Sequence, residues 1–234
     1  MIKAIITDIE GTTTSLSFVK DILFPYARAN MADYIRGHAN DPQVKKLLED
    51  VCRESGLNAQ SGSVQGEKIG QLIDQLIRWI DEDKKVTPLK SLQGLIWEEG
   101  YERGAFCGHL YPDAAAGLKA WSVGGLKLYV YSSGSVQAQK LLFAHTDYGD
   151  LTPLFSGYFD TCTGGKKERE SYRKIAEQTG YPAEALLFLS DVKEELDAAR
   201  AAGLHTTWVT RDETPDPQAE HRQVKDFTEI SISL

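Results

Sequence analysis

The stretch that decides the fold is the first one, Met1-Ile-Lys-Ala-Ile-Ile-Thr-Asp8-Ile-Glu10-Gly-Thr-Thr13. Residues 2–6 form a short, β-branched apolar run, which is typical of a strand buried on both faces of a sheet. The run leads into Asp8 and Glu10, and Gly11 marks the turn where the strand ends. Ligands of open parallel sheets bind outside the carboxyl ends of the strands. Two acids at that point indicate a catalytic role, against the alternative that Asp8 only caps a turn.

After Thr13 the pattern changes from strand to helix. The clearest helical signal is an amphipathic series whose spacing predicts one buried helix face: Leu72, Ile73, Leu76, Ile77 and Ile80. Asp41-Pro42 predicts a capped helix start, and Pro25 predicts a kink or restart within an earlier helix. Residues 55–70 are rich in Gly, Ser, Gln and Asn, which predicts that this stretch contains a loop.

Strands and helices alternate from Tyr111 onward. The strands are predicted at 126–131, 158–162, 186–189 and 205–209, and helices separate them. This alternation predicts an α/β fold with a Rossmann-like, doubly wound parallel sheet. A connection as long as the one after the first strand requires structure of its own. We therefore predict an α/β catalytic core, residues 1–15 and 110–234, with an inserted all-helical cap domain, residues 16–109.

Composition and charge argue against several classes of protein. The chain of 234 residues carries a formal net charge of −8, so no basic surface indicates nucleic acid as a partner. No apolar run reaches the ~18 residues that span a bilayer, and the N-terminus lacks a secretory pattern. The three cysteines have no metal-type spacing and are expected to be reduced thiols. We expect a cytoplasmic protein without a membrane partner.

Polar residues cluster at four predicted strand ends: Asp8 with Glu10, Ser132 with Ser133, Lys166, and Asp191. Each has an ordinary structural alternative, since Ser132 and Asp191 could cap helices and Lys166 could be a solvated loop residue. Their joint order, acid-x-acid, Ser, Lys and Asp, resembles the motif series of the haloacid dehalogenase-like hydrolases. The insertion after the first motif resembles the helical cap of that superfamily.

A closer resemblance is carried by the motifs Asp8-Ile-Glu-Gly-Thr-Thr13, Tyr131-Ser-Ser-Gly-Ser135, Gly165-Lys166 followed by Ser171-Tyr172, and Phe188-Leu-Ser-Asp191-Val. Together they resemble the enolase-phosphatase family of methionine salvage, also called acireductone synthases. The resemblance covers essentially the whole chain. Members of the superfamily commonly have a second Asp where Glu10 stands, and the Glu belongs to the enolase-phosphatase pattern.

The resemblance implies a Mg²⁺-dependent enzyme that converts 2,3-diketo-5-methylthiopentyl-1-phosphate to acireductone and phosphate through an aspartyl-phosphate. It implies a monomer that acts on this small phosphorylated diketone. The implied catalytic residues are Asp8, as nucleophile, and Glu10, as acid and base. The residues expected to bind the phosphate are Ser132, Ser133, Gly134 and Lys166. The metal is expected to bind Asp8, Asp191 and an oxygen of Glu10, from either its side chain or its backbone.

Alternative functions remain at this stage. The chain could be another phosphate monoesterase, or a dehalogenase that uses Asp8 against carbon. A dehalogenase has no phosphate charge to neutralise, so its activity would survive EDTA. The chain could also bind phosphorylated ligands without turnover, which steady release of phosphate would disprove. The group that removes the C1 proton of the substrate is not identified by the sequence.

Overall fold

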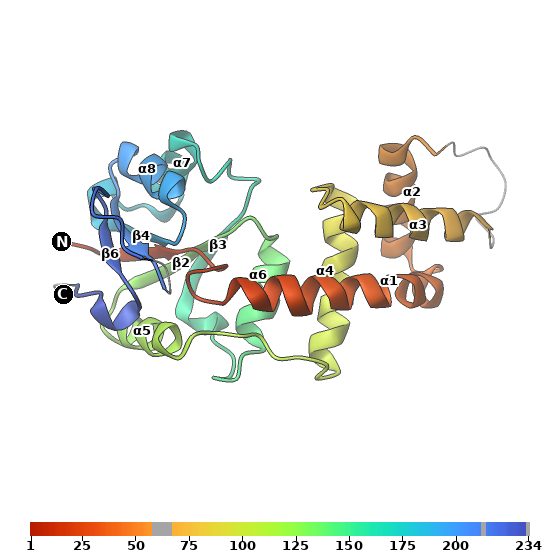
Figure 1. The fold of residues 1–234 in the computed structure, drawn as a ribbon, viewed down its shortest axis with the longest axis horizontal. Coiled ribbons are helices and arrows are strands. Elements are labelled where there is room, and N and C mark those ends of the chain that lie inside the picture. The colour runs from red at the N-terminus through yellow and green to blue at the C-terminus, as the bar shows by residue number, and fades with distance from the viewer. Residues whose placement is uncertain (58–66, 212–213, 233–234) are drawn as a thin grey trace. The chain divides into compact units, whose positions relative to one another are not determined.

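The chain divides into two compact units, Met1–Phe18 with Cys107–Leu234 and Val19–Phe106. The computed structural model describes residues 1–57, 67–211 and 214–232 (Figure 1). The first unit contains the sheet and the second is helical. Their boundaries lie at 18/19 and 106/107, where the sequence analysis placed them at 15/16 and 109/110. Within the described residues, no helix combines the length and the apolar character that crossing a membrane requires.

A six-stranded sheet forms the centre of the first unit, in the order β3-β2-β1-β4-β5-β6. Every neighbouring pair is parallel. The strands are β1 (Ala4–Thr7), β2 (Lys127–Tyr131), β3 (Phe155–Phe159), β4 (Leu186–Ser190), β5 (His205–Val209) and β6 (Arg222–Val224). The predicted doubly wound α/β fold is confirmed. Because β1 pairs with both β2 and β4, the carboxyl ends of these three strands are neighbours.

Helices cover both faces of this sheet (Figure 1). They are α5 (Pro112–Val123), α6 (Val136–Ala144), α7 (Arg169–Thr179) and α8 (Lys193–Ala201). One face packs against α7 and α8 through a buried cluster that includes Ile6, Tyr172, Phe188 and Leu196. Figure 1 shows α5 on the opposite side of the sheet. Layers on both faces explain why every residue of β1 and β4 is buried and why their apolar residues do not alternate with exposed polar ones.

Two strand predictions were wrong in detail. We predicted a strand at 158–162, but β3 ends at Phe159 because Asp160 turns the chain, its carboxylate accepting a hydrogen bond from the Cys162 amide at 2.8 Å. Strand β6 lies after the last predicted strand, 205–209, where no further strand was predicted. It is short and carries two polar residues, so it has no apolar alternation to predict it.

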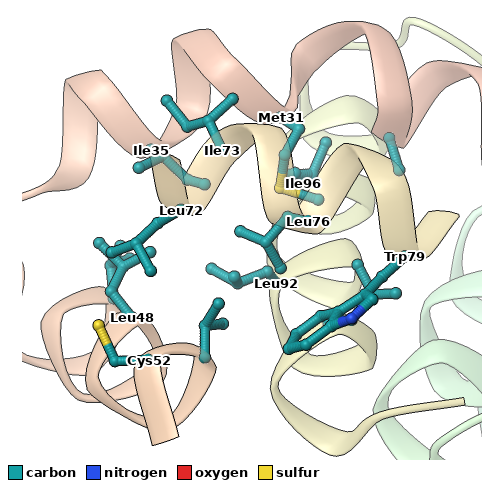
Figure 2. Close-up of a cluster of buried hydrophobic side chains, with 14 residues drawn as sticks. Met31, Ile35, Leu48, Cys52, Leu72, Ile73, Leu76, Trp79, Leu92 and Ile96 are labelled. Atoms are coloured by element: carbon teal, nitrogen blue, oxygen red, sulfur yellow. The ribbon is translucent and has the colours of Figure 1, made fainter. Parts of the chain in front are cut away.

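The helical unit contains α1 (Phe24–His38), α2 (Pro42–Ser55), α3 (Glu67–Asp81) and α4 (Thr87–Glu102), after a π-helical turn at Phe18–Leu23. Pro25 lies in the first turn of α1, which agrees with the predicted restart. The Asp41 carboxylate caps α2 by accepting from the Gln43 amide at 2.8 Å, as its position predicted. Leu72, Ile73 and Leu76 are buried in the core of this unit (Figure 2). Most of the stretch 55–70, which was predicted to contain a loop, lies outside the described residues.

Candidate active site

Asp8 occupies the first position after β1. It is 4% exposed, and its amide donates to the Leu189 carbonyl of β4 at 2.9 Å. Its carbonyl accepts hydrogen bonds from the hydroxyls of Thr7 and Thr13, at 2.9 and 3.3 Å. The backbone of Asp8 is therefore fixed by its strand neighbour and by the turn that follows.

Asp191 lies against the turn that follows Asp8. Gly11 has a φ of +74°, and a Cβ at this position would lie 2.0 Å from Oδ2 of Asp191, so no larger side chain fits. The Thr12 hydroxyl donates to Oδ1 of Asp191 at 3.4 Å. Glu10 lies within the turn, half-buried, and its backbone forms an isolated bridge with Thr14. The sequence Glu-Gly-Thr-Thr thus shapes a turn against the end of β4.

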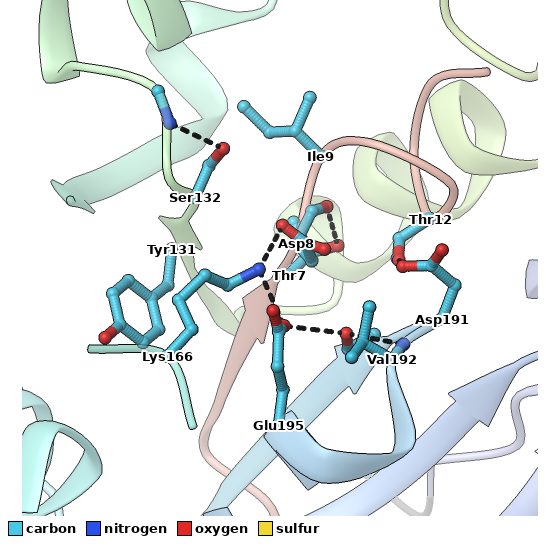
Figure 3. Close-up of polar contacts among 12 residues, drawn as sticks. Thr7, Asp8, Ile9, Thr12, Tyr131, Ser132, Lys166, Asp191, Val192 and Glu195 are labelled. Carbon is cyan, nitrogen blue, oxygen red and sulfur yellow. Dashed lines mark hydrogen bonds and ion pairs between the residues drawn. The ribbon is translucent and has the colours of Figure 1, made fainter. Parts of the chain in front are cut away.

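Lys166 joins Asp8 to a third acid (Figure 3). Its Nζ lies 2.7 Å from Oδ1 of Asp8 and 2.6 Å from Oε2 of Glu195. The Lys166 side chain is 9% exposed. Burial alone would lower the pKa of Lys166, but the two carboxylates outweigh it and the pKa is raised, so the ammonium stays charged.

Glu195 was missed by the sequence analysis. It lies in the first turn of α8, where acidic residues are ordinarily solvated, but it is 7% exposed and also accepts from the Ser190 hydroxyl at 3.0 Å. Burial, and then the charge of Asp8, raise the pKa of Glu195. One signal could have identified it. Glu195 stands next to Leu196 and four residues before Ala199, so helical spacing places it on the buried face.

Asp191 follows β4, and its surroundings strongly perturb its carboxyl group. Burial, and then repulsion from Asp8, raise its pKa to about 7. Two carboxylates that repel each other in a buried place favour a cation between them. Among the described residues, no three side chains of His, Cys, Asp or Glu are grouped closely enough to form a complete metal site by themselves. Mg²⁺ prefers hard oxygen ligands and retains waters, so Asp8, Asp191 and a backbone carbonyl fit this ion.

The segment Ser132–Ser135 follows the neighbouring strand β2 and leads into α6. The Ser132 amide donates to the Phe159 carbonyl at 3.2 Å, and the Ser132 hydroxyl accepts from the Gly134 amide at 3.3 Å. Ser135 caps α6, with its hydroxyl accepting from the Ala138 amide at 3.2 Å. Ser133 and Gly134 therefore precede a capped helix N-terminus, which is a favourable place for an anion.

Buried Gln139 holds this segment in place from α6. Its side-chain amide donates to the carbonyls of Gly134 and Phe159, at 2.9 and 2.8 Å. Gln139 was not predicted from the sequence, because a glutamine inside a helix carries no distinctive signal.

Arg211 was also missed, although it holds the turn after Asp8. Its guanidinium donates to the Thr12 carbonyl, forms an ion pair with Asp113 at 2.7 Å, and stacks over the Tyr111 ring at 3.9 Å. The turn is therefore held by Arg211, which follows β5, as well as by Asp191, which follows β4.

Of the residues predicted from the sequence, the structure brings Asp8 and Lys166 into direct contact and places Asp191 against the Asp8 turn. Ser132, Ser133 and Gly134 follow the adjacent strand. A buried carboxylate held in one position by an ammonium is a suitable nucleophile. The cationic and amide groups around it suit an anionic substrate.

Comparison with known proteins agrees with this chemistry. The profile of the haloacid dehalogenase-like hydrolases matches residues 2–203. The chain is 56% identical to enolase-phosphatase E1 of Methylococcus capsulatus over 234 residues, which is 100% of both chains. It is 52% identical to enolase-phosphatase E1 of Thioalkalivibrio sulfidiphilus, over 99% of this chain and 100% of that one.

Solved structures give the same result for the fold. The UTR4 protein of Saccharomyces cerevisiae is 33% identical, with a TM-score of 0.83 over 98% of this chain and 100% of that one. The L-2-haloacid dehalogenase of Xanthobacter autotrophicus has a TM-score of 0.56 at 18% identity, over 97% and 96% of the two chains, and shares the fold. The chain therefore belongs to the haloacid dehalogenase-like hydrolases and, among them, to the enolase-phosphatases.

Proposed function

We propose that this enolase-phosphatase converts 2,3-diketo-5-methylthiopentyl-1-phosphate to acireductone and inorganic phosphate, as a step of methionine salvage. The main support is the buried charge network at the end of β1, in which Lys166 holds Asp8 at 2.7 Å and Asp191 lies against the following turn. Full-length identity of 50–56% to proteins named enolase-phosphatase E1 supports the substrate class.

Asp8 is the proposed nucleophile. Its carboxylate oxygen would attack phosphorus, forming a bond from Asp8 to phosphorus and breaking the bond to the substrate oxygen. Water would then hydrolyse the aspartyl-phosphate and regenerate the carboxylate. This route replaces one slow displacement by two easier ones. The ion pair with Lys166, at 2.7 Å, restricts the rotamers of Asp8.

The phosphate oxygens are proposed to bind Lys166, the Ser132 hydroxyl and the amides of Ser133 and Gly134. Lys166 is already charged and buried, so its attraction for the phosphate is weakly screened by water. Amides at the start of α6 add the favourable end of the helix dipole.

Glu10 is proposed to protonate the leaving oxygen and then to activate the attacking water. Its side chain is one methylene longer than Asp, which extends its reach toward C1 of the substrate. Proton removal at C1, next to a ketone, must precede loss of phosphate in the full reaction. We propose that Glu10 takes part in that step.

Mg²⁺ is proposed to bind Asp8, Asp191 and an oxygen of Glu10, and when bound it supplies positive charge that offsets the phosphate and polarises the adjacent carbonyl. The support from this chain is the raised pKa of Asp191, about 7, which is caused first by burial and then by repulsion from Asp8.

The unit Val19–Phe106 is proposed to act as the cap domain that selects the substrate, and the enzyme is proposed to be a cytoplasmic monomer. Light scattering after size exclusion tests the monomer directly.

The function is tested by incubating the protein with the diketo phosphate and Mg²⁺. Phosphate release and exchange of the C1 proton are followed separately, the second by NMR. We expect both activities with Mg²⁺ and neither after removal of metal by EDTA. Phosphate release no faster than with the Asp8→Asn variant would overturn the proposal, and full activity in EDTA would indicate metal-independent chemistry.

A further inference from the structure

The loop that carries Lys166 is held by three side-chain hydroxyls. Gly164, Gly165 and Lys166 lie outside any strand or helix, yet each carbonyl accepts a hydrogen bond. The donors are Tyr131 to Gly164 at 2.9 Å, Ser171 to Gly165 at 2.8 Å, and Tyr172 to Lys166 at 2.6 Å. We call Tyr131, Ser171 and Tyr172 the hydroxyl clamp.

The clamp is rigid because its members are buried in regular structure. Tyr131 ends β2, and Ser171 and Tyr172 lie in the first turn of α7. Tyr131 and Tyr172 are 0% exposed and Ser171 is 1% exposed. The two tyrosine rings meet edge to face at 5.5 Å, and Tyr172 packs against Phe188 at 5.1 Å.

The phenols of the clamp are donors under all ordinary conditions. Burial raises the pKa of both Tyr131 and Tyr172, so both keep their protons. A carbonyl oxygen can only accept, so the direction of each hydrogen bond is fixed.

The backbone of the loop can approach the hydroxyl clamp closely because it contains a glycine at position 164. Gly164 has a φ of +151°, and a Cβ there would lie 2.2 Å from the Ser171 hydroxyl. Only glycine allows the chain to come so close to α7. The sequence Gly-Gly-Lys followed by Ser171-Tyr172 is thus one unit, with the loop on one side and its donors on the other.

Lys166 needs such support because its side chain is long. Its ammonium must meet Asp8 and Glu195 together, at 2.7 and 2.6 Å. A lysine side chain is among those that lose the most rotamer entropy when they are fixed. Fixing the backbone from which it extends restricts the positions that the ammonium can reach.

We propose that Tyr172, assisted by Tyr131 and Ser171, is a positioning residue that holds Lys166 where its ammonium serves both Asp8 and the phosphate of the substrate. The phosphate part of this inference rests on the proposed function. The part that concerns the contacts of the hydroxyl clamp with the loop does not depend on the proposed function.

The test variant is Tyr172→Phe, which removes one oxygen and keeps the ring packing. The matched control is Tyr158→Phe on β3, a half-buried tyrosine whose hydroxyl has no hydrogen-bond partner among the described residues. Two quantities are measured for each variant. One is kcat/KM for p-nitrophenyl phosphate with Mg²⁺, and the other is the ¹⁵N NMR signal of the Lys166 ammonium, assigned by its loss in Lys166→Met.

We expect Tyr172→Phe to lower kcat/KM by about tenfold to a hundredfold, since a displacement of ~1 Å costs about a hundredfold in rate. In this variant the NMR signal of the Lys166 ammonium should shift, and its protons should exchange faster with solvent. Tyr158→Phe should change kcat/KM by less than about twofold. If Tyr172 acts through Lys166, adding Tyr172→Phe to Lys166→Met should cause less than about twofold further loss.

A folded Tyr172→Phe protein with wild-type kcat/KM and an unchanged ammonium signal would overturn the inference. An equal loss in the Lys166→Met background would also overturn it, because the effect would then not pass through the lysine. If Tyr172→Phe does not fold, Ser171→Ala undergoes the same measurements with the same criteria. If the wild type releases no phosphate, the proposed function fails, and the ammonium signal alone still decides whether Tyr172 positions Lys166.

Discussion

Removing the positive charge of Lys166 is expected to destabilise the fold and to lower phosphate release strongly, to a residual rate that can still be measured. Lys166→Met keeps an unbranched side chain of similar length, so it removes mainly the charge and its two ion pairs. The side chains of Asp8 and Glu195 are 6% and 9% exposed. Both carboxylates would remain buried without the cation that now lies between them.

The size of the effect follows from this burial. Removing one partner of a buried ion pair costs about 3–5 kcal/mol, because the remaining charge is uncompensated. In a domain of this size each kcal/mol lowers the melting temperature by about 2–4 °C. We therefore expect the melting temperature to fall by about 6–20 °C at neutral pH.

The loss of stability in Lys166→Met should depend on pH in a definite direction. Burial and Asp8 already raise the pKa of Glu195, and loss of Lys166 would raise it further. A carboxyl with a raised pKa in the fold binds more protons folded than unfolded, so stability falls as pH rises above the ordinary carboxyl pKa of about 4.3. The deficit of Lys166→Met is thus expected to be largest at neutral pH and to shrink as the pH approaches that value.

The assay is thermal unfolding in EDTA at neutral and mildly acidic pH, with phosphate release measured in parallel with Mg²⁺. The matched control is Lys167→Met, whose side chain is 64% exposed and whose nearest acid, Glu194, is 3.7 Å away. Adding Glu195→Gln to Lys166→Met should restore part of the stability without restoring activity. A Lys166→Met protein as stable as the Lys167→Met control at neutral pH, or one that releases phosphate normally, would refute the reasoning.

The remaining predictions concern the metal and the acid. Asp191→Asn should raise the Mg²⁺ concentration needed for half activity and weaken the rise in melting temperature on adding Mg²⁺; an unchanged Mg²⁺ dependence would remove Asp191 from the ligands. Glu10→Asp should lower the rate on the diketo phosphate more than on p-nitrophenyl phosphate, because a loss of ~1 Å in reach costs about a hundredfold. Equal losses on the two substrates would show that Glu10 has no special part in C1 proton removal.

The sequence alone predicted the sheet, apart from β6, and the positions of the acids that follow its strands. The apolar runs that became β1 and β4 ended at Asp8 and Asp191, and parallel strands place such ends together. Helix starts were also readable wherever a local rule applied, as at Asp41-Pro42. The motif residues Asp8 and Lys166 meet in the structure because both belong to loops at the same edge of the sheet.

Other features could not be read from local patterns. Helical spacing could place Glu195 on a buried face, but no local pattern shows that its partner is Lys166, which lies in a separate loop. Arg211 donates a hydrogen bond to the carbonyl of Thr12, from which almost the whole length of the sequence separates it. Any residue can accept a hydrogen bond through its backbone carbonyl, so the residue type at the accepting position does not reveal the bond. Ser171 and Tyr172 were therefore noted in the sequence only as part of a motif, without a structural role.

The most direct test of the central claim is detection of a phosphoryl group on Asp8 during turnover. The reaction with the diketo phosphate and Mg²⁺ is quenched with acid in the steady state, and the peptide that contains Asp8 is analysed by mass spectrometry. We expect the phosphoryl group on Asp8 in the wild type, its absence before substrate is added, and no phosphate release by Asp8→Asn. Turnover with the phosphoryl group on another residue, or phosphate release by Asp8→Asn above about a hundredth of the wild-type rate, would contradict the assignment of Asp8 as nucleophile.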